Sequence, residues 1–134
     1  MEIDYERLAE LLADRLAPAL PSSVSLVSVG DTLVASSFPP TLTLMRLDYR
    51  ELGHVPDRWE SLMDAIANAL DQIEDEASEA TADRYESDFA VEEEQLRIWF
   101  GLVPPGTMET AWRHVLPELV SIPLEEFTTP PTAA

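Results

Sequence analysis

The sequence predicts an α+β domain in which two amphipathic helices cover one antiparallel sheet of five strands, forming a two-layer sandwich. Apolar residues recur at helical spacing in two segments, and they alternate with polar residues in five shorter segments. Short turns join the strands, which makes neighbouring strands antiparallel. The expected order of elements is α-β-β-β-α-β-β, followed by a short helix. The length of 134 residues suits a single domain, expected over residues 1–127 and followed by a disordered tail over 128–134.

The first part of the chain predicts a helix and three strands. Residues 3–20 place leucines on one stripe and acidic residues opposite, as in an amphipathic helix that ends at prolines. The apolar period then changes to two in segments 24–29 and 32–36. The two-residue turn between them begins with Gly30, which favours a type II′ hairpin. Alternation over 41–47 predicts the third strand.

A long central helix is the clearest element of the sequence. Asp57 is the expected N-cap, and Glu60 three residues later completes a capping box that satisfies free backbone donors. Apolar residues then recur at helical spacing for some six turns. The members of this stripe are Trp59, Leu62, Met63, Ile66, Leu70, Ile73, Ala77 and Ala80.

The last third of the chain predicts a second hairpin and a short helix. Apolar and polar residues alternate over 85–92 and again over 96–102. Thr107 is a candidate N-cap for the short helix, which Pro117 should end. Residues 118–124 are expected to be extended rather than helical.

Acidity is the outstanding feature of the composition. The chain has 26 Asp and Glu against 8 basic residues, a formal net charge of −18. This charge excludes nucleic-acid binders of the usual kind and docking to anionic lipid, because both need clustered basic residues. All basic residues are arginine and there is no cysteine, so Schiff-base lysines, thiolate catalysis and cysteine-bound zinc are excluded. The acidic N-terminus does not resemble a signal peptide, and we expect a cytoplasmic protein without membrane contact.

No motif indicates catalysis or a bound metal or cofactor, and we predict that the chain is not an enzyme. His54 and His114 are interpreted as structural or exposed, because no nucleophile motif accompanies them. Residues 71–94 hold eleven acids and one arginine. Carboxylates suit Ca²⁺ or Mg²⁺, but a calcium loop of the EF-hand type requires a glycine that this segment lacks. The simpler interpretation is a solvated helix face that continues into strand edges.

The second face of the predicted sheet is partly apolar. Trp99 alternates with Ile98 and Phe100, so it faces away from the helices if those two side chains face them. An apolar outer surface on a soluble protein marks an association site. The alternative is that a C-terminal segment folds over it. The expected outer surface comprises Trp99 with the neighbouring Arg97, and Val27, Val29 and Met45 from the other strands.

The order of elements, the small size and the acidity resemble the YbjN and type III secretion chaperone-like group. The resemblance covers residues 3 to about 120. It implies a non-enzymatic protein, and the secretion chaperones are acidic homodimers that bind an extended segment of a partner along sheet and helix surfaces. Pro117 and Pro123 depart from the group, because they shorten the amphipathic helix with which it usually ends. Two local stretches are also similar to those of small acidic proteins from high-GC genomes, namely Leu96-Arg97-Ile98-Trp99-Phe100-Gly101 and Ile122-Pro123-Leu124.

The sequence therefore favours a non-catalytic, chaperone- or adaptor-like module that binds another protein, and a homodimer. An apolar sheet or helix surface would supply the contact, and an acidic rim would select a partner that is basic or has an apolar segment. An immunity protein or antitoxin that masks the basic, nuclease-like site of a toxin is the alternative. An enzyme that uses His54 or a carboxylate pair is a third hypothesis. The acidic residues expected in partner binding are Asp71, Glu74, Asp75 and Glu79.

Overall fold

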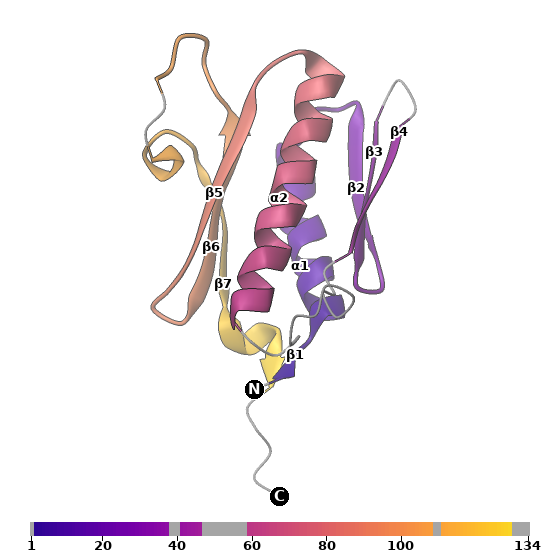
Figure 1. Ribbon diagram of the computed structural model, residues 1–134, viewed down its shortest axis with the longest axis vertical. Coiled ribbons are helices and arrows are strands. Elements are labelled where there is room, and N and C mark those ends of the chain that lie inside the picture. Colours follow the sequence, from indigo (N-terminus) through magenta and orange to yellow (C-terminus); the bar gives the residue numbers. More distant parts are fainter. Residues whose placement is uncertain (1, 38–40, 47–58, 109–110, 130–134) are drawn as a thin grey trace, which may run out of the picture.

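The fold consists of three layers, with two helices between two antiparallel sheets (Figure 1). A computed structural model describes residues 2–37, 41–46, 59–108 and 111–129. The predicted α+β class is confirmed. The predicted single sheet of five strands is wrong, because the described strands form two separate sheets of three strands and a short terminal pair.

The first sheet has the strand order β2-β3-β4. Its strands are β2 (Val24–Val29), β3 (Thr32–Ser37) and β4 (Thr41–Arg46), and each neighbouring pair is antiparallel. Val29 pairs with Thr32 across a two-residue turn in which Gly30 has a φ of +61°. This positive φ is what the first central position of a type II′ turn requires, and glycine adopts it without steric cost.

The second sheet has the order β5-β6-β7, with β5 (Tyr85–Glu92), β6 (Gln95–Leu102) and β7 (Glu118–Pro123). The predicted hairpin is therefore confirmed, and the segment expected to be extended forms β7. The predicted short helix is reduced to a 3-10 turn over Trp112–His114 in the described residues. Pro117 follows closely, and its carbonyl oxygen accepts a hydrogen bond of 3.2 Å from the Phe100 N–H, which draws the chain into the sheet.

Two helices form the middle layer. The first is α1 (Tyr5–Leu16), whose N-cap Asp4 accepts a hydrogen bond of 3.0 Å from the Arg7 N–H. A 3-10 turn over Ala17–Ala19 continues it. The second helix, α2 (Trp59–Thr81), confirms the predicted central helix. Its predicted cap at Asp57 lies outside the described residues.

The helices separate the two sheets because each helix is buried on more than one side. The buried residues of α1 spread over roughly 200° of its surface at 3.6 residues per turn, wider than one sheet can cover. Accordingly, α1 packs against β2, β3 and β7, while α2 packs against β3, β4 and β5. A sheet on each side of the helices buries the apolar residues on both sides of the helix layer. The wide stripe of α1 is Leu8, Ala9, Leu11, Leu12, Ala13 and Leu16.

The two ends of the chain are paired. β1 (Glu2–Ile3) is antiparallel to β8 (Thr128–Thr129). The Asp4 N–H donates a hydrogen bond of 2.8 Å to the Phe127 carbonyl oxygen, and the Phe127 side chain is buried in the core. The tail predicted over 128–134 is therefore corrected at its start, because Thr128 and Thr129 belong to a strand. Residues 130–134 lie outside the described residues.

Candidate functional site

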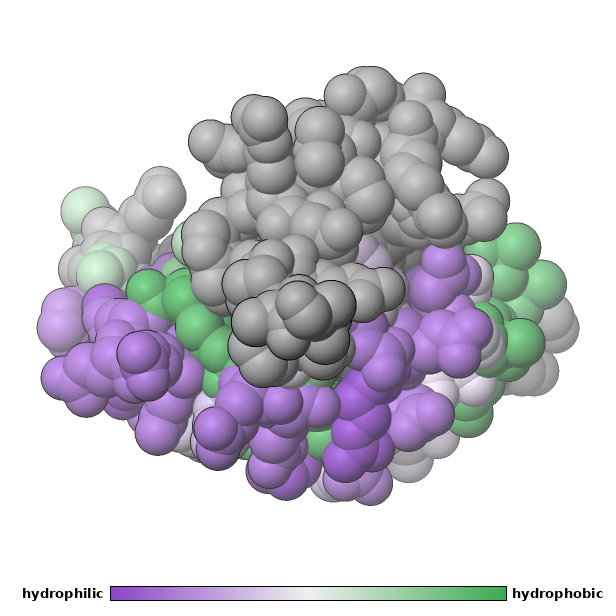
Figure 2. All heavy atoms as spheres, turned by 90° about the horizontal axis from the view of Figure 1, so that it is seen from below, coloured by the Kyte–Doolittle hydropathy of each residue, from purple (hydrophilic) through white to green (hydrophobic). Residues whose placement is uncertain are grey.

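The outer face of the β2-β3-β4 sheet is apolar and exposed. Val27 and Val29 of β2 are 53% and 65% exposed, and Leu42 and Leu44 of β4 are 67% and 62% exposed. Val34 lies between Val27 and Leu44 in register and is partly exposed. Figure 2 shows hydrophobic side chains gathered at the edge of the molecule where this sheet lies. We call Val27, Val29, Val34, Leu42 and Leu44 the apolar outer face.

The outer side of this sheet carries no acidic residue. Ser25 and Ser36 lie opposite each other in register, and their hydroxyl oxygens are 2.6 Å apart in a hydrogen bond. The three strands contain no Asp or Glu, although the chain has 26. Arg46, at the register position opposite Thr32, is their one charged residue. The outer side of this sheet, with Arg46 at one corner, is therefore free of acidic residues on a strongly acidic protein.

The prediction of which residues of β4 face outward is wrong. Val27 and Val29 lie on the outer face as expected, but Met45 pairs in register with the buried Leu33, a position of the inner face. Leu42 and Leu44 occupy the outer positions instead. Both alternating sets of β4 contain apolar residues, so a period of two does not decide which set faces the core.

The corresponding outer face of the β5-β6-β7 sheet is covered by the chain itself. Trp99 is only 5% exposed and packs with Val103 and Leu116, and with the partly buried Trp112. All three partners belong to the connection between β6 and β7. Trp99 is thus not exposed for a partner, and the alternative expected from the sequence, cover by a C-terminal segment, is what the structure has.

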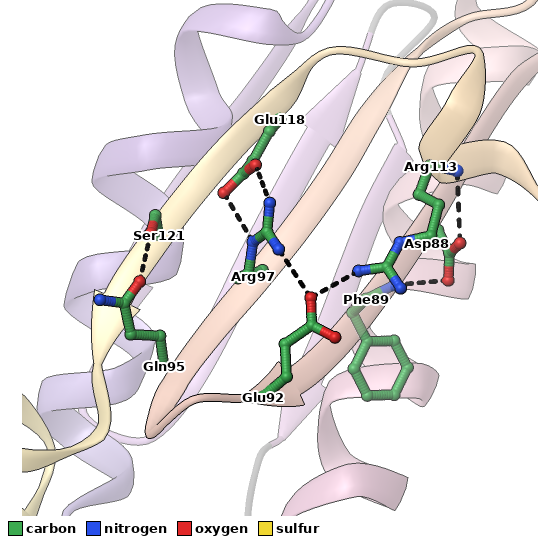
Figure 3. A network of polar contacts seen from close by, with 8 residues as sticks. All are labelled: Asp88, Phe89, Glu92, Gln95, Arg97, Arg113, Glu118 and Ser121. Carbon is green, nitrogen blue, oxygen red and sulfur yellow. Dashed lines mark hydrogen bonds and ion pairs between the residues drawn. The ribbon is translucent and has the colours of Figure 1, made fainter.

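Ion pairs between arginine and carboxylate side chains connect the covering segment and the strands of this sheet (Figure 3). The Arg97 guanidinium donates to both oxygens of Glu118, at 3.1 and 2.6 Å, and to Glu92 at 2.6 Å. Arg113 donates to the same Glu92 oxygen at 2.8 Å. The guanidinium carbons of Arg97 and Arg113 lie 4.8 and 4.2 Å from the centre of the Trp99 ring.

These hydrogen bonds shift the pKa values of Glu92, Glu118 and Arg97. Hydrogen bonds from Arg113 and Arg97 lower the pKa of Glu92, and the hydrogen bond from Arg97 lowers the pKa of Glu118. The Glu118 carboxylate in turn raises the pKa of Arg97. Arg97, which the sequence indicated as a partner-binding residue, is therefore engaged within the molecule.

The acidic residues predicted to bind a partner lie on α2 but differ in their exposure to solvent. Asp71, Asp75 and Glu79 are exposed. Glu74 is half-buried against β5, where it accepts a hydrogen bond from the Ser87 hydroxyl. Burial raises the pKa of Glu74 to about 7, and the nearby carboxylates of Glu86, Asp71 and Asp75 add to the rise, while the Ser87 hydrogen bond opposes it. A hollow of about 210 Å³ adjoins it, lined by Ala67, Leu70, Asp71, Glu74, Glu86, Ser87, Asp88 and Phe89.

Replacing Glu74 by glutamine is expected to stabilise the protein at pH 8 and to leave its stability near pH 4 unchanged. The folded-state pKa of Glu74 lies above the ordinary value of 4.5, so the folded protein binds more protons than the unfolded chain between about pH 4.5 and 7. The contribution of Glu74 to stability therefore falls as the pH rises through this range. We expect Glu74→Gln to raise the free energy of unfolding by about 1 kcal/mol at pH 8, well below the full shift because water reaches half of the group.

Denaturant unfolding at both pH values measures this effect, and Glu79→Gln is the matched control. Glu79 lies on the same helix and is exposed, so its substitution removes the same charge without relieving burial. Equal effects of the two substitutions at pH 8 would show that general charge repulsion, and not the burial of Glu74, determines the result.

Glu76 is a buried carboxylate that the sequence reasoning missed. It is 6% exposed and accepts hydrogen bonds from the Ser37 hydroxyl of β3, at 3.1 Å, and from the Thr43 hydroxyl of β4. A signal was present, because position 76 falls on the apolar stripe between Ile73 and Ala80. Glu76 connects the central helix to the inner side of the β2-β3-β4 sheet.

A second hollow, of about 260 Å³, is lined by Asp83, Arg84 and the segment Leu102 to Thr107 among the described residues. The described residues contain no group of three His, Asp or Glu side chains arranged to hold a metal ion. His114 is exposed in the 3-10 turn, and His54 lies outside the described residues. No helix in the described part of the chain is long and apolar enough to cross a membrane.

Comparison with protein families, curated proteins and solved structures finds no match for this chain.

Proposed function

We propose that this protein is a non-catalytic, chaperone- or adaptor-like module that binds another protein through the apolar outer face. One observation carries the proposal. The chain covers the outer face of the β5-β6-β7 sheet with its own side chains, yet it leaves four large apolar residues of the β2-β3-β4 sheet more than half exposed. Contiguous exposed apolar area on a small protein is typical of an interaction surface.

The partner's chemistry follows from the face and its surroundings. The apolar outer face lies on strands without acidic residues, so it suits an apolar strand or segment. The rest of the chain carries the net charge of −18, which accelerates the encounter with a basic partner and repels acidic ones. We therefore expect a partner that combines an apolar segment with basic flanks.

The family resemblance supports the same proposal. The order α-β-β-β-α-β-β on which it was based is present from α1 to β6. The described chain then continues into strand β7, where that group has a helix. Binding of an extended partner segment along a sheet surface, as in the secretion chaperones, is the mode that the apolar outer face would allow.

An immunity protein or antitoxin is the second candidate, and the hollow between α2 and β5 favours it. Four carboxylates line this hollow, and none of its lining residues is basic. Carboxylates grouped in this way resemble the phosphates that a nuclease site binds. Contact through carboxylates weakens steeply with salt, whereas contact through the apolar outer face does not.

Capture of partners from the source cell is expected to depend on the apolar outer face. The test variant carries Val27→Thr and Leu44→Thr, which remove apolar area and place β-branched threonine, suited to a strand, at both positions. The control variant carries Val115→Thr and Met108→Thr, at apolar residues that are 40% and 81% exposed elsewhere. We expect the affinity of the captured protein to fall by more than about tenfold for the test variant and to stay unchanged for the control.

A third variant, with Asp71→Asn, Asp75→Asn and Glu79→Gln, removes one carboxylate of the hollow and the next two exposed acids on the same face of α2, and it separates binding through acidic residues from binding through the apolar outer face. If this variant loses the partner while the Val27/Leu44 variant retains it, the acidic surface is the binding site and the main proposal fails. All three variants change exposed side chains, so circular dichroism and unfolding should show little change in stability.

A further inference from the structure

Two carboxylates of α2 accept hydrogen bonds on opposite sides of the helix. Glu74 accepts one from the Ser87 hydroxyl of β5. Glu76 accepts them from the hydroxyls of Ser37 in β3 and Thr43 in β4. Two residues along a helix differ by about 200° around its axis, so these side chains leave α2 in opposite directions. Because α2 lies between the two sheets (Figure 1), a polar contact attaches it to each of them.

The contact with β5 changes with pH. Glu74 is half-buried beside the hollow between α2 and β5. Burial raises the pKa of Glu74 to about 7, and neighbouring carboxylates add to the rise, against the opposing effect of the Ser87 hydrogen bond. Glu74 therefore changes its charge between about pH 6 and 8.

The charged groups around Glu74 are carboxylates from both elements that form this contact. They are Asp71 and Asp75 of α2 and Glu86 and Asp88 of β5. Glu86 is paired with Arg84 at 2.9 Å, and no residue that lines the hollow is basic. An ionised Glu74 is therefore repelled from both sides, which makes the contact between α2 and β5 less favourable.

The contact with the other sheet connects α2 to the apolar outer face. Thr43 lies between Leu42 and Leu44 in β4, and its hydroxyl points inward to Glu76 while both leucines point outward. The backbone hydrogen bonds of a helix hold neighbouring turns together, so a displacement at Glu74 also displaces Glu76, two residues away. Movement of α2 therefore reaches Leu42 and Leu44 through Thr43.

We propose that protonation of Glu74 sets the position of α2 between the two sheets, and that this position controls the apolar outer face through Glu76 and Thr43. The inference rests on the proposed function, because it states how partner binding to that face is regulated. With a neutral Glu74, α2 keeps its contacts with both sheets. With a charged Glu74, the contact with β5 weakens, and the affinity of the apolar outer face for its partner falls several-fold.

Methyl NMR of the free protein between about pH 5.5 and 8.5 tests this coupling. Leu70 lines the hollow and reports the titration of Glu74, while Leu42 and Leu44 report the state of the apolar outer face. Ile3, buried in the terminal strand pair, is the control signal. We expect Leu70, Leu42 and Leu44 to shift together with a midpoint near pH 7, and Ile3 to stay unchanged.

Three variants separate the titration from its transmission. Glu74→Gln should abolish all three responses, whereas Glu79→Gln, at an exposed position of the same helix, should keep them. Glu76→Gln leaves a single acceptor oxygen for the two hydroxyls. In this variant Leu70 should still titrate, but the responses of Leu42 and Leu44 should be lost.

The proposal fails if Leu70 shows no titration near pH 7, or if it titrates without any response of Leu42 and Leu44. It also fails if Leu42 and Leu44 still respond in Glu74→Gln, which would assign the response to other groups, or in Glu76→Gln, which would exclude the connection through Glu76. These measurements involve no partner, so none of these results decides the proposed function. Conversely, the absence of a captured partner at both about pH 6 and about pH 8 would remove the proposed function and leave the coupling intact.

Discussion

Replacing Trp99 by alanine is expected to lower the free energy of unfolding by about 3 kcal/mol, as for other buried tryptophans. The side chain is 5% exposed and lies beneath Val103 and Leu116. Its removal leaves a cavity, and it also removes the ring on which the Arg97 and Arg113 guanidinium groups lie. The segment between β6 and β7 should then become more sensitive to proteolysis, because its main apolar contact is lost.

Denaturant unfolding measures this effect, with Val115→Ala as a control in the same segment. Val115 is 40% exposed, so its substitution should change stability by less than about 0.5 kcal/mol. A loss below about 1 kcal/mol for Trp99→Ala would contradict the account of a covered face. Trp99 would then be available to a partner, as its position in the strand pattern first indicated.

The second large effect is expected at Glu76. Glu76→Ala removes the acceptor of two hydroxyl groups, those of Ser37 and Thr43. Because the site is buried, these hydroxyls would lose partners that water does not readily replace. We expect a loss of about 2 kcal/mol in the free energy of unfolding.

A combined variant tests the physical reason for this loss. Glu76→Leu together with Ser37→Ala and Thr43→Val removes the acceptor and both donors, and fills the site with apolar atoms. This variant should regain most of the stability lost by Glu76→Ala, because no polar group is left unpaired. If it is less stable than Glu76→Ala, the carboxylate stabilises the fold by more than the pairing of these two hydroxyls.

Local patterns were sufficient to predict the main elements and part of the candidate site. The alternation around Gly30 predicts the β2-β3 hairpin and places Val27 and Val29 on its second face, where the structure has them. The stripe of α2 likewise predicts the central helix. These predictions succeed because apolar residues recur on the buried side of each helix or strand, at the period of that element.

Contacts between distant segments account for what was missed. Met45 and Leu44 are both apolar, so the phase of β4 depends on Thr43, which turns inward to bond Glu76 of α2. Trp99 is covered by residues of the connection between β6 and β7. This connection is irregular, so its sequence has no apolar period from which its packing could be predicted. The two separate sheets follow from the breadth of the buried surface of α1, which the sequence reasoning treated as a single stripe.

The central claim is that the apolar outer face is the protein-binding surface, and methyl NMR tests it most directly. The captured partner is added to labelled protein at a concentration where the chain is monomeric. The account predicts that methyl signals of Val27, Val29, Leu42 and Leu44 shift or broaden. Signals of Leu102 and Val115, which are 51% and 40% exposed on other surfaces, should stay unchanged. Perturbation of Leu102 and Val115 without change in the four face residues would contradict the claim.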